Sequence, residues 1–485
     1  MAEVTHTAVI IGSGFGGQLA AINLRKRGIA DFVILERRDF MGGTWCQNSY
    51  PGAAVDVQSP LYCIADEPYP WTQMFADQAE LQRYTEHLLA KHRLREHTVT
   101  GADVVQATWD GAAWQVRTRD RGTYTGRFLI NASGPLSNPS IPAFRGIDAF
   151  QGAAFHTNNW DHNYDYRGKR VAVVGTGASG AQVIPEIQPD VAELHVFMRT
   201  PHWVIPRPDR AFTTRQRRLL AHRGPQHALR NAIYWSLETR LIGFKYSDFM
   251  LRTMGRDRAL RHLHEQVSDP QLRAQLTPDY TIGCKRIILS DTLYPALAAD
   301  NTTVHAGQAG IDHLDATGIV TTTGEHIDLD LVVWATGYDA TDNAIPYPIL
   351  GRGGRTLQSV WQPFPRAYLG TTVPGFPNLF LVTGPNTGIG HTSALFIIEC
   401  QMAYIMSAMQ EVRARGAGAI EVTTPAEGDY TRTIHREMEK TVWKSGGCHS
   451  WYQSKSGHVI AMYPGFSFSY RRAARRFRPE HHVVS

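Results

Sequence analysis

The chain of 485 residues is long enough for two or three domains with sizeable hydrophobic cores. Its 43% of apolar and 19% of charged residues are typical of a globular protein and exclude a disordered or fibrous chain. The net charge of +5 is small for this length. The basic run from Arg471 to Arg478 is interpreted as a solvated helix face, so no nucleic-acid partner is expected.

The N-terminal segment and the apolar runs favour a cytoplasmic protein. The first expected strand begins close behind Met1 and leaves no room for a signal peptide, and no apolar run approaches the ~18 residues of a membrane span. The scattered cysteines contain no CxxC pair, which argues against a disulfide framework, a zinc site and a redox-active dithiol. We expect no metal, and we expect the cysteines to be buried small apolar residues. They are Cys46, Cys63, Cys284, Cys400 and Cys448.

A glycine-rich turn follows the first apolar run. The segment AVIIGSGFGG contains Gly12, Gly14 and Gly17, and the next expected strand, VILE, ends at Glu36. A turn that only glycine permits, placed between a strand and a helix, directs the helix amides at a pyrophosphate. A carboxylate at the tip of the second strand accepts hydrogen bonds from a ribose 2'-hydroxyl and repels a 2'-phosphate. This copy therefore predicts FAD or NAD.

The same arrangement occurs again in the middle of the chain. The segment VAVVGTGASG contains Gly175, Gly177 and Gly180, and the strand HVFMRT ends at Arg199 and Thr200. Arg199 has the same place relative to its turn as Glu36 has in the first copy. A guanidinium at this place binds a 2'-phosphate, which predicts NADPH. A single turn of this kind also serves plain strand-to-helix packing, but two in matching register with opposite charges indicate two dinucleotides.

The remaining segments place both turns in an α/β fold with two Rossmann-like dinucleotide-binding domains, one for FAD and one for NADPH, and a helical insertion. Each half closes with a small-residue turn, Ala132 to Gly134 in one and Ala335 to Gly337 in the other. The stretch between Pro206 and Thr281 has helical spacing and no strand pattern. We expect an FAD domain over 1–138 and 335–485, an NADP domain over 139–205 and 284–334, and the insertion over 206–283. Near the end, Thr392 and Ser393 are candidate caps of an apolar helix.

Two further patterns point to a reaction class. FQGAAFHTNNWD, residues 150–161, fits F-x-G-x-x-x-H-x-x-x-W-(P or D) at every specified position. GGTWCQNSYPGAAVD, residues 42–56, fits (A or G)-G-x-W-x-x-x-x-(F or Y)-P-(G or M)-x-x-x-D throughout. With both patterns the chain resembles the type I Baeyer–Villiger monooxygenases over essentially its whole length. Related N- and S-oxygenating flavin monooxygenases usually carry another aromatic ring at the place of Trp160 and lack the second pattern.

The resemblance implies an FAD- and NADPH-dependent oxidation of a small-molecule ketone by O2 through a C4a-peroxyflavin, giving an ester or lactone. It implies that Arg286 stabilises the flavin peroxide, with Asp56 holding this arginine in place. A guanidinium suits that role because it is a permanent cation that cannot give up a proton. It also implies that Lys285 helps to bind the 2'-phosphate and that Trp451 closes over the nicotinamide ribose. From the residues alone, a Lys-Arg pair such as Lys285 and Arg286 is more often a surface feature, and Trp451 could equally be a core indole.

The implied contacts form three groups. For FAD they are Gly12, Ser13, Gly14, Phe15, Gly16, Gly17, Glu36, Arg37, Thr44, Trp45, Asp56, Tyr62 and Val104. For NADP they are Gly175, Thr176, Gly177, Ala178, Ser179, Gly180, Arg199, Thr200, Lys285, Arg286 and Trp451. His156 and Trp160 belong to the linker and are expected to couple nicotinamide binding to domain movement, although a histidine in a polar linker is more often structural.

Three alternatives stay open at this point. One is N- or S-oxygenation in the same architecture, and another is a non-catalytic flavin and NADPH sensor. The third is a reductase of the disulfide type, against which the missing CxxC argues.

Overall fold

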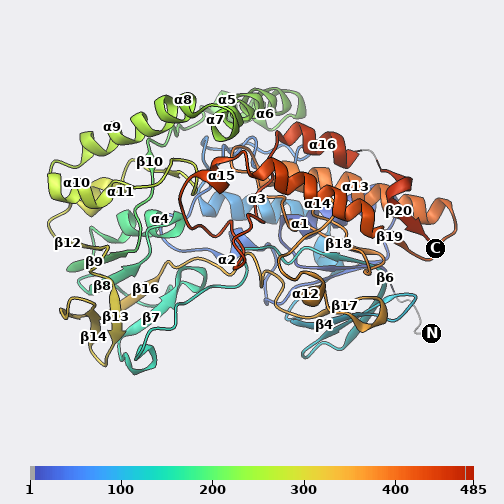
Figure 1. Ribbon diagram of the computed structural model, residues 1–485, viewed down its shortest axis with the longest axis horizontal. Helices are drawn as coiled ribbons and strands as arrows, with labels where there is room; N and C mark the ends of the chain where they lie inside the picture. The colour runs from blue at the N-terminus through green and yellow to red at the C-terminus, as the bar shows by residue number, and fades with distance from the viewer. Residues whose placement is uncertain (1–5, 476) are drawn as a thin grey trace.

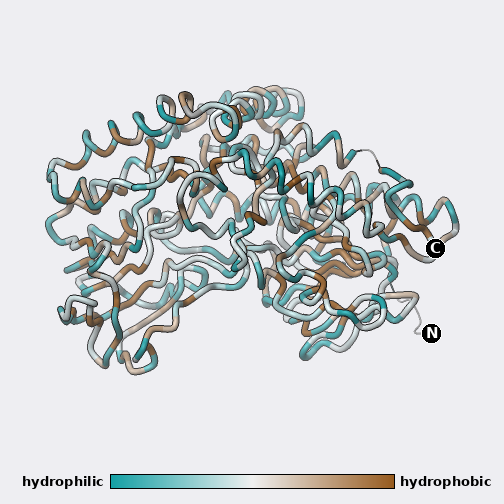
Figure 2. Tube along the Cα trace, in the orientation of Figure 1, coloured by the Kyte–Doolittle hydropathy of each residue, from teal (hydrophilic) through white to brown (hydrophobic). Residues whose placement is uncertain are grey.

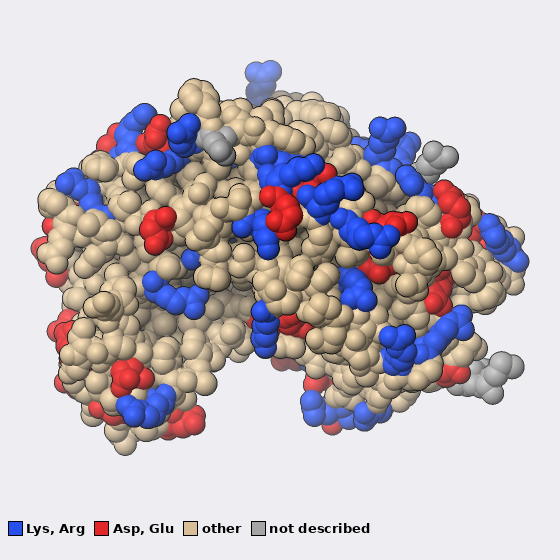
Figure 3. Space-filling view, viewed as in Figure 1, with Lys and Arg blue, Asp and Glu red and all other residues tan. Residues whose placement is uncertain are grey.

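The computed structural model describes residues 6–475 and 477–485. A mixed sheet and a wholly parallel sheet, each with its own hydrophobic core, lie next to each other, and a layer of helices covers them from one side (Figure 1). Apolar residues run through the strands of both sheets, and the outer helices are more hydrophilic (Figure 2). The surface is hollowed between the two sheet-bearing lobes, and acidic and basic side chains are intermixed on the visible face (Figure 3).

The first sheet is built around β1 (His6–Ile11), which pairs in parallel with β2 (Phe32–Leu35) and β6 (Thr123–Asn131). All four residues of β2 are buried, as expected for a parallel strand covered on both faces. The strand order is β17-β4-β5-β6-β1-β2-β3, and β18 also pairs with β6. The other strands are β3 (Thr98–Val99), β4 (Val104–Trp109), β5 (Trp114–Thr118), β17 (Ile349–Leu350) and β18 (Leu379–Leu381).

The second sheet is wholly parallel, in the order β12-β9-β8-β16-β7. Its strands are β7 (Ala153–His156), β8 (Arg170–Val174), β9 (Glu193–Met198), β12 (Thr302–Ala306) and β16 (Leu331–Trp334). An antiparallel sheet of β13 (Ile311–Leu314), β14 (Gly318–Thr321) and β15 (His326–Asp328) packs its apolar side chains against one face. Each glycine-rich turn thus follows an interior strand of its sheet, β1 in the first and β8 in the second, which confirms the α/β fold with two Rossmann-like units.

Helices fill the chain between the short parallel strands β10 (Val204–Ile205) and β11 (Ile288–Leu289). They are α5 (Thr214–Leu220), α6 (Arg223–Glu238), α7 (Arg240–Lys245), α8 (Asp248–Met250), the π-helical η4 (Leu251–Arg256), α9 (Asp257–Gln266) and α10 (Pro270–Leu276). In Figure 1 this layer forms the upper rim of the molecule. The three sets of domain boundaries given above stay predictions.

The longest helix of the described chain, α13 (Ala394–Ala414), packs against α1 (Phe15–Lys26) and α16 (Ser467–Arg475). The hydroxyl of Ser393 caps it by accepting a hydrogen bond of 3.2 Å from the amide of Leu395. The remaining helices and strands are α2 (Thr44–Gln47), α3 (Gln78–Lys91), α4 (Ala178–Ile187), α11 (Leu293–Leu297), α12 (Leu357–Val360), α14 (Thr424–Met438), α15 (Val442–Ser445), β19 (Ile420–Val422) and β20 (His482–Val484).

The helices of the structure bear on the expected solvated basic face and on the expected lack of a membrane span. Arg471, Arg472 and Arg475 are exposed on α16, as a solvated helix face requires, whereas Arg476 of the same run lies outside the described residues. No helix within 6–475 and 477–485 is long and apolar enough to cross a membrane.

Candidate active site

Both glycine-rich turns have the backbone geometry that a dinucleotide requires. The φ angles of Gly12 and Gly175 are +96° and +106°, which is a conformation that side chains disfavour. A Cβ atom at Gly175 would lie 2.5 Å from the carbonyl oxygen of Ala335, and one at Gly12 would overlap the carbonyl of Ala132. Each glycine turn is therefore pressed against the small-residue turn that closes its own half, and a larger residue would separate the two.

The helices that follow the turns begin without a side-chain cap. Gly14 and Gly177 occupy the N-cap positions of α1 and α4 and offer no oxygen to the first-turn amides. A Cβ atom at Gly177 would meet nothing within 4 Å, so the backbone there borders open space. Uncapped amides at a helix N-terminus are donors for a phosphate. Both turns thus fit the pyrophosphate of a dinucleotide.

Glu36 lies at the tip of β2, directly beside the first turn. Its carboxylate accepts hydrogen bonds of 2.9 and 2.6 Å from the amide and hydroxyl of Ser13, and one of 3.0 Å from the amide of Arg38. Of its neighbours in the predicted FAD group, Arg37 donates to the 137–138 linker and Val104 is buried in the first sheet. Thr44 is the first residue of α2.

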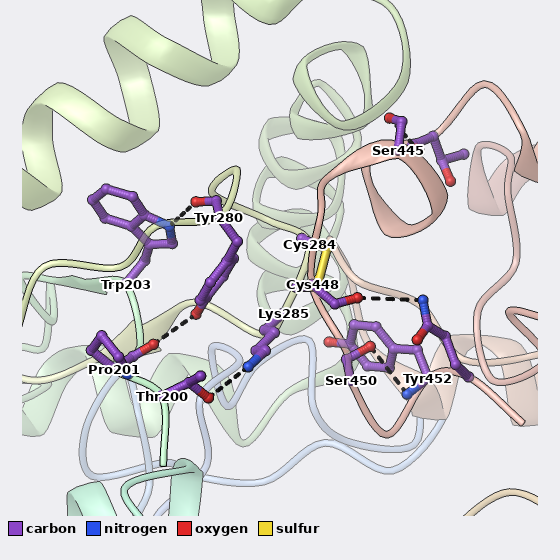
Figure 4. The surroundings of a disulfide bond; sticks show 12 residues. Thr200, Pro201, Trp203, Tyr280, Cys284, Lys285, Ser445, Cys448, Ser450 and Tyr452 are labelled. Atoms are coloured by element: carbon purple, nitrogen blue, oxygen red, sulfur yellow. Dashed lines mark hydrogen bonds between the residues drawn. A yellow bond between two sulfur atoms is a disulfide. The ribbon is translucent and has the colours of Figure 1, made fainter. Parts of the chain in front are cut away.

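At the matching place in the second sheet the structure gathers positive charge. Arg199 and Thr200 follow β9, and the ammonium group of Lys285 donates a 2.8 Å hydrogen bond to the hydroxyl of Thr200 (Figure 4). Burial lowers the pKa of Lys285, and the charge of Arg199 lowers it further, partly offset by Asp279. Two cations that disfavour one another in this way form a site that an anion stabilises.

Arg286 and Asp56 join the two halves. The guanidinium Nε of Arg286 donates to the Oδ2 atom of Asp56 in a short ion pair, and about a third of each side chain is exposed, 36% and 32%. The pKa of Arg286 is raised above its ordinary value, chiefly because the negative charge of Asp56 lies beside it. The arginine is therefore held in one position as a fixed cation.

A group of aromatic rings connects this ion pair to the first turn. The indole Nε1 of Trp45 donates a 3.1 Å hydrogen bond to the hydroxyl of Tyr62, and the two rings meet edge to face at 5.8 Å. Tyr62 also packs edge to face against Phe15, the first residue of α1, at 6.1 Å. Burial raises the pKa of Tyr62 to about 12, so this hydroxyl stays a neutral hydrogen-bonding group.

The segment before Asp56 packs on the helix of the second turn. The hydroxyl of Tyr50 donates to the side-chain oxygen of Gln182 at 2.9 Å, and the amide of Gln182 donates to the carbonyl of Ala54, also at 2.9 Å. A Cβ atom at Gly52 would lie 2.5 Å from the backbone oxygen of Gln182. The pattern of residues 42–56 thus begins at one nucleotide turn and ends by covering the other. Sequence reasoning missed Gln182, which lies beyond the glycine-rich motif.

The linker histidine is buried and neutral. His156 ends β7 beside Trp334 of β16 and is 3% exposed. Its Nδ1 atom accepts a 3.0 Å hydrogen bond from the amide of Asn158, and burial lowers its pKa to about 4. Trp160 is also buried and packs edge to face on Phe155 at 5.0 Å. Both side chains therefore pack where the linker joins the second sheet.

Three polar residues that the sequence analysis missed connect the two patterns. The side-chain amide of Asn158 donates to the hydroxyl of Tyr338 at 3.0 Å, and this hydroxyl donates to the side-chain oxygen of Asn48 at 2.7 Å. Asn48 and Asn158 stand at unspecified positions of the patterns 42–56 and 150–161, so no sequence signal distinguished them. Tyr338 directly follows the turn of Ala335 to Gly337, and this position next to a predicted turn was the one sequence signal that could have identified it.

Two of the five cysteines are not the isolated apolar residues that we expected. Cys284 and Cys448 form a disulfide across a sequence separation of 164 residues. The expectation was wrong because spacing rules detect pairs that are close in sequence or belong to a framework, whereas this pair is brought together by the tertiary fold. Cys63 and Cys400 are free and buried, and Cys46 is free and half-buried.

Trp451 follows the disulfide and is 45% exposed. Its ring contacts only the adjacent Tyr452 among the aromatic side chains described, at 4.7 Å. It is therefore not a core indole, and it can contact a ligand at the surface.

The site thus consists of two glycine-rich turns, of the residues Glu36 and Arg199 with opposite charges at the ends of the strands that follow, and of an arginine fixed between the halves. This combination defines the class of two-nucleotide oxidoreductases. In agreement, residues 9–217 match the family model described as pyridine nucleotide-disulphide oxidoreductase. A Baeyer–Villiger monooxygenase of Pseudomonas aeruginosa is 43% identical over 98% of this chain and 91% of its own. The chain therefore belongs to the Baeyer–Villiger monooxygenases, as its two patterns predicted.

Solved structures agree with this assignment. The structure of an oxidized steroid monooxygenase bound to NADP is 31% identical and superimposes with a TM-score of 0.87, covering 99% of both chains. An epsilon-caprolactone-bound cyclohexanone monooxygenase is 27% identical with a TM-score of 0.87 and covers 100% of both chains.

The buried His156 predicts an acid-dependent loss of stability. Its folded pKa of about 4 lies below the ordinary value of about 6.5, so between these values the unfolded chain binds a proton that the folded one does not. Stability therefore falls as the pH falls through this window. The variant His156→Asn keeps an acceptor near the place of Nδ1 but cannot take up this proton. Between pH 6.5 and pH 4, its free energy of unfolding, measured with urea, should therefore fall by up to about 3 kcal/mol less than that of the parent protein.

The exposed His264 on α9 provides the control. His264→Asn should reproduce the pH dependence of the parent protein. If the free energy of unfolding depends on pH equally in all three proteins, His156 takes up its proton as readily in the folded chain as in the unfolded one, and its pKa is not lowered by burial.

Proposed function

We propose that this Baeyer–Villiger monooxygenase uses FAD and NADPH to convert a ketone and O2 into an ester or lactone and water. The observation that carries the proposal is the fixed cation of Arg286, held by Asp56 between two turns that fit dinucleotides. The NADP and the lactone in the related structures support the same cosubstrate and the same product class for this chain.

In this proposal the first turn holds FAD. The amides of α1 bind the pyrophosphate, and Glu36 accepts the ribose hydroxyls in exchange for its present bonds to Ser13. Trp45 and Tyr62 line the flavin side of the site. Bound FAD, once reduced by NADPH, would supply the electrons that activate O2 for insertion beside the carbonyl carbon.

The second turn holds NADPH in the same way. The amides of α4 bind its pyrophosphate, while Arg199, Thr200 and Lys285 bind the 2'-phosphate. The lowered pKa of Lys285 supports this role, because the phosphate relieves the repulsion between Lys285 and Arg199. Trp451 covers the nicotinamide ribose from the exposed loop.

Arg286 stabilises the negative charge that the activated oxygen carries before it attacks the ketone. A guanidinium stabilises such an anion without protonating it, and the ion pair with Asp56 fixes its direction in advance. The surrounding rings of Tyr62 and Tyr452 exclude water that would release the oxygen as hydrogen peroxide. Heteroatom oxygenation needs no such unprotonated anion and therefore depends less on Arg286.

Replacing the central arginine should separate NADPH consumption from ester formation. In Arg286→Ala the fixed cation is lost, and we expect the rate of ester formation to fall by about 10²–10³-fold, as for the loss of one oxyanion donor. NADPH oxidation should continue and yield hydrogen peroxide. The measurement is ester by gas chromatography and peroxide by a coupled assay, for a panel of ketones.

The exposed Arg218 on α5 serves as the matched control, because Arg218→Ala removes the same charge from the outer helical layer, outside both nucleotide turns. It should leave the ratio of ester to peroxide unchanged. If Arg286→Ala keeps the ester yield of the parent protein, the proposed role of Arg286 is wrong.

The choice of NADPH over NADH should depend on Arg199. In Arg199→Ala one charged partner of the 2'-phosphate is removed, which is worth about 1.5–3 kcal/mol. We expect the KM for NADPH to rise by about 10–100-fold, while the KM for NADH, which has no 2'-phosphate, changes little. Steady-state NADPH and NADH oxidation measures both constants, and an equal rise for both would contradict the assignment.

A further inference from the structure

The Cys284–Cys448 disulfide joins the two segments that would enclose the nicotinamide end of the site. Cys284 directly precedes Lys285 and Arg286, and Cys448 lies in the loop that carries Trp451 (Figure 4). The Cα atoms of the two cysteines are 6.1 Å apart. A covalent bond therefore connects the cationic segment to the exposed loop directly, although 164 residues separate them in sequence.

Other contacts hold this loop at its two ends but not in the middle. At one end the amide of Thr281 donates to the carbonyl of Gly446 at 3.0 Å, and at the other end Tyr452 is 2% exposed. Between them, Gly447, His449 and Trp451 are exposed. Among the described residues, the hydrogen bonds that enter this stretch come from the next two residues of the same loop. The amide of Gln453 donates to the carbonyl of Ser450 at 3.1 Å, the amide of Tyr452 donates to the hydroxyl of Ser450 at 3.4 Å, and the side chain of Gln453 donates to the carbonyl of Cys448 at 3.5 Å.

The two cysteines differ in their exposure to solvent. Cys284 is 1% exposed and packs so closely that a Cβ atom at Gly446 would lie 2.6 Å from its own Cβ. Cys448 is only partly buried, on the loop itself. A dissolved thiol is therefore expected to attack the disulfide at Cys448, with Cys284 as the leaving thiolate.

We propose that this disulfide is a redox-dependent positioning crosslink that holds the 447–451 loop, and Trp451 with it, against the Lys285 segment, so that reduction by a dithiol weakens NADPH binding. The inference rests on the NADPH site proposed above. Without the crosslink the loop gains conformational freedom that it must lose again whenever Trp451 closes over the ligand. The crosslink thus lowers the entropy cost of binding NADPH without contacting it.

The redox step balances with the dithiol as the only co-reactant. A thiolate of the dithiol attacks the sulfur of Cys448, the bond between Cys448 and Cys284 breaks, and the leaving thiolate of Cys284 takes up a proton. The second thiol of the dithiol then resolves the mixed disulfide and releases Cys448 as a thiol. The protein gains two electrons and two protons, and the dithiol becomes a cyclic disulfide.

The test compares the full-length, FAD-loaded enzyme before and after treatment with dithiothreitol, with removal of the reagent under argon. Mass spectrometry after alkylation confirms the state of the two cysteines. We expect reduction to raise the KM for NADPH by about 5–20-fold, with kcat for NADPH oxidation changed less than twofold. The untreated variant Cys448→Ser should already have the raised KM of the reduced parent protein, and dithiothreitol should not change it further. This variant therefore controls for effects of the reagent elsewhere in the protein.

Trp451 separates loop positioning from a general loss of structure. In Trp451→Ala the KM for NADPH should already be raised, and reduction should change it by less than twofold, because the crosslink acts through this ring. Two results would overturn the inference. One is an unchanged KM after verified reduction, and the other is an undiminished response to reduction in Trp451→Ala.

NADPH oxidation keeps this test independent of the ketone. If the parent protein forms no ester from any ketone but its KM for NADPH responds to reduction, the proposed monooxygenation fails and the crosslink stands. If ester forms and the KM does not respond, the crosslink fails and the proposed function stands. If Cys448→Ser does not fold, the treated parent protein still decides the question.

Discussion

Asp56 and Arg286 meet where the halves of the molecule that carry the two nucleotide turns come together. Neither residue belongs to a glycine-rich turn, and each is delivered by a different segment of the chain. Asp56 ends the stretch that begins beside the first turn, where the amide of Gly42 donates to the hydroxyl of Ser13. Arg286 lies where the chain returns from the helical layer to the second sheet. A fixed cation at this meeting point requires both halves to be in register, because a displacement of either separates the carboxylate from the guanidinium.

Much of the surrounding structure serves to keep that register. Tyr50 and Ala54 bond to Gln182 on α4, and Asn48 reaches Asn158 through the hydroxyl of Tyr338. These are hydrogen bonds between neutral groups, each worth about 1 kcal/mol net, so the halves can shift without breaking either core. Such an interface suits an enzyme in which the nicotinamide must approach the flavin and then make room for a ketone.

The sequence predicted the parts of this site that local rules determine. The two turns, the opposite charges of Glu36 and Arg199, and the small residues at Ala132 and Ala335 follow from backbone sterics and from the chemistry of ribose and phosphate. The roles of Arg286 and Asp56 came only from family resemblance, because a Lys-Arg pair alone resembles a surface loop. The structure contains the ion pair that the resemblance implied between these two residues.

Contacts between distant segments could not be predicted in the same way. Gln182, Tyr338 and the Cys284–Cys448 pair depend on how the sheets and the C-terminal segment pack together, and no periodicity or spacing encodes that. The disulfide was missed for this reason and not through an unusual composition. A pair of cysteines 164 residues apart has no local signature.

The most direct test of the central claim is a double-mutant cycle on Asp56 and Arg286, measured as the fraction of NADPH oxidation that yields ester. If the two residues act as one unit, Asp56→Asn and Arg286→Ala each abolish most ester formation, and the double variant is no worse than the more damaged single one. If the two losses multiply instead, or if Asp56→Asn forms ester normally, then Asp56 does not hold Arg286 for catalysis and the account is wrong.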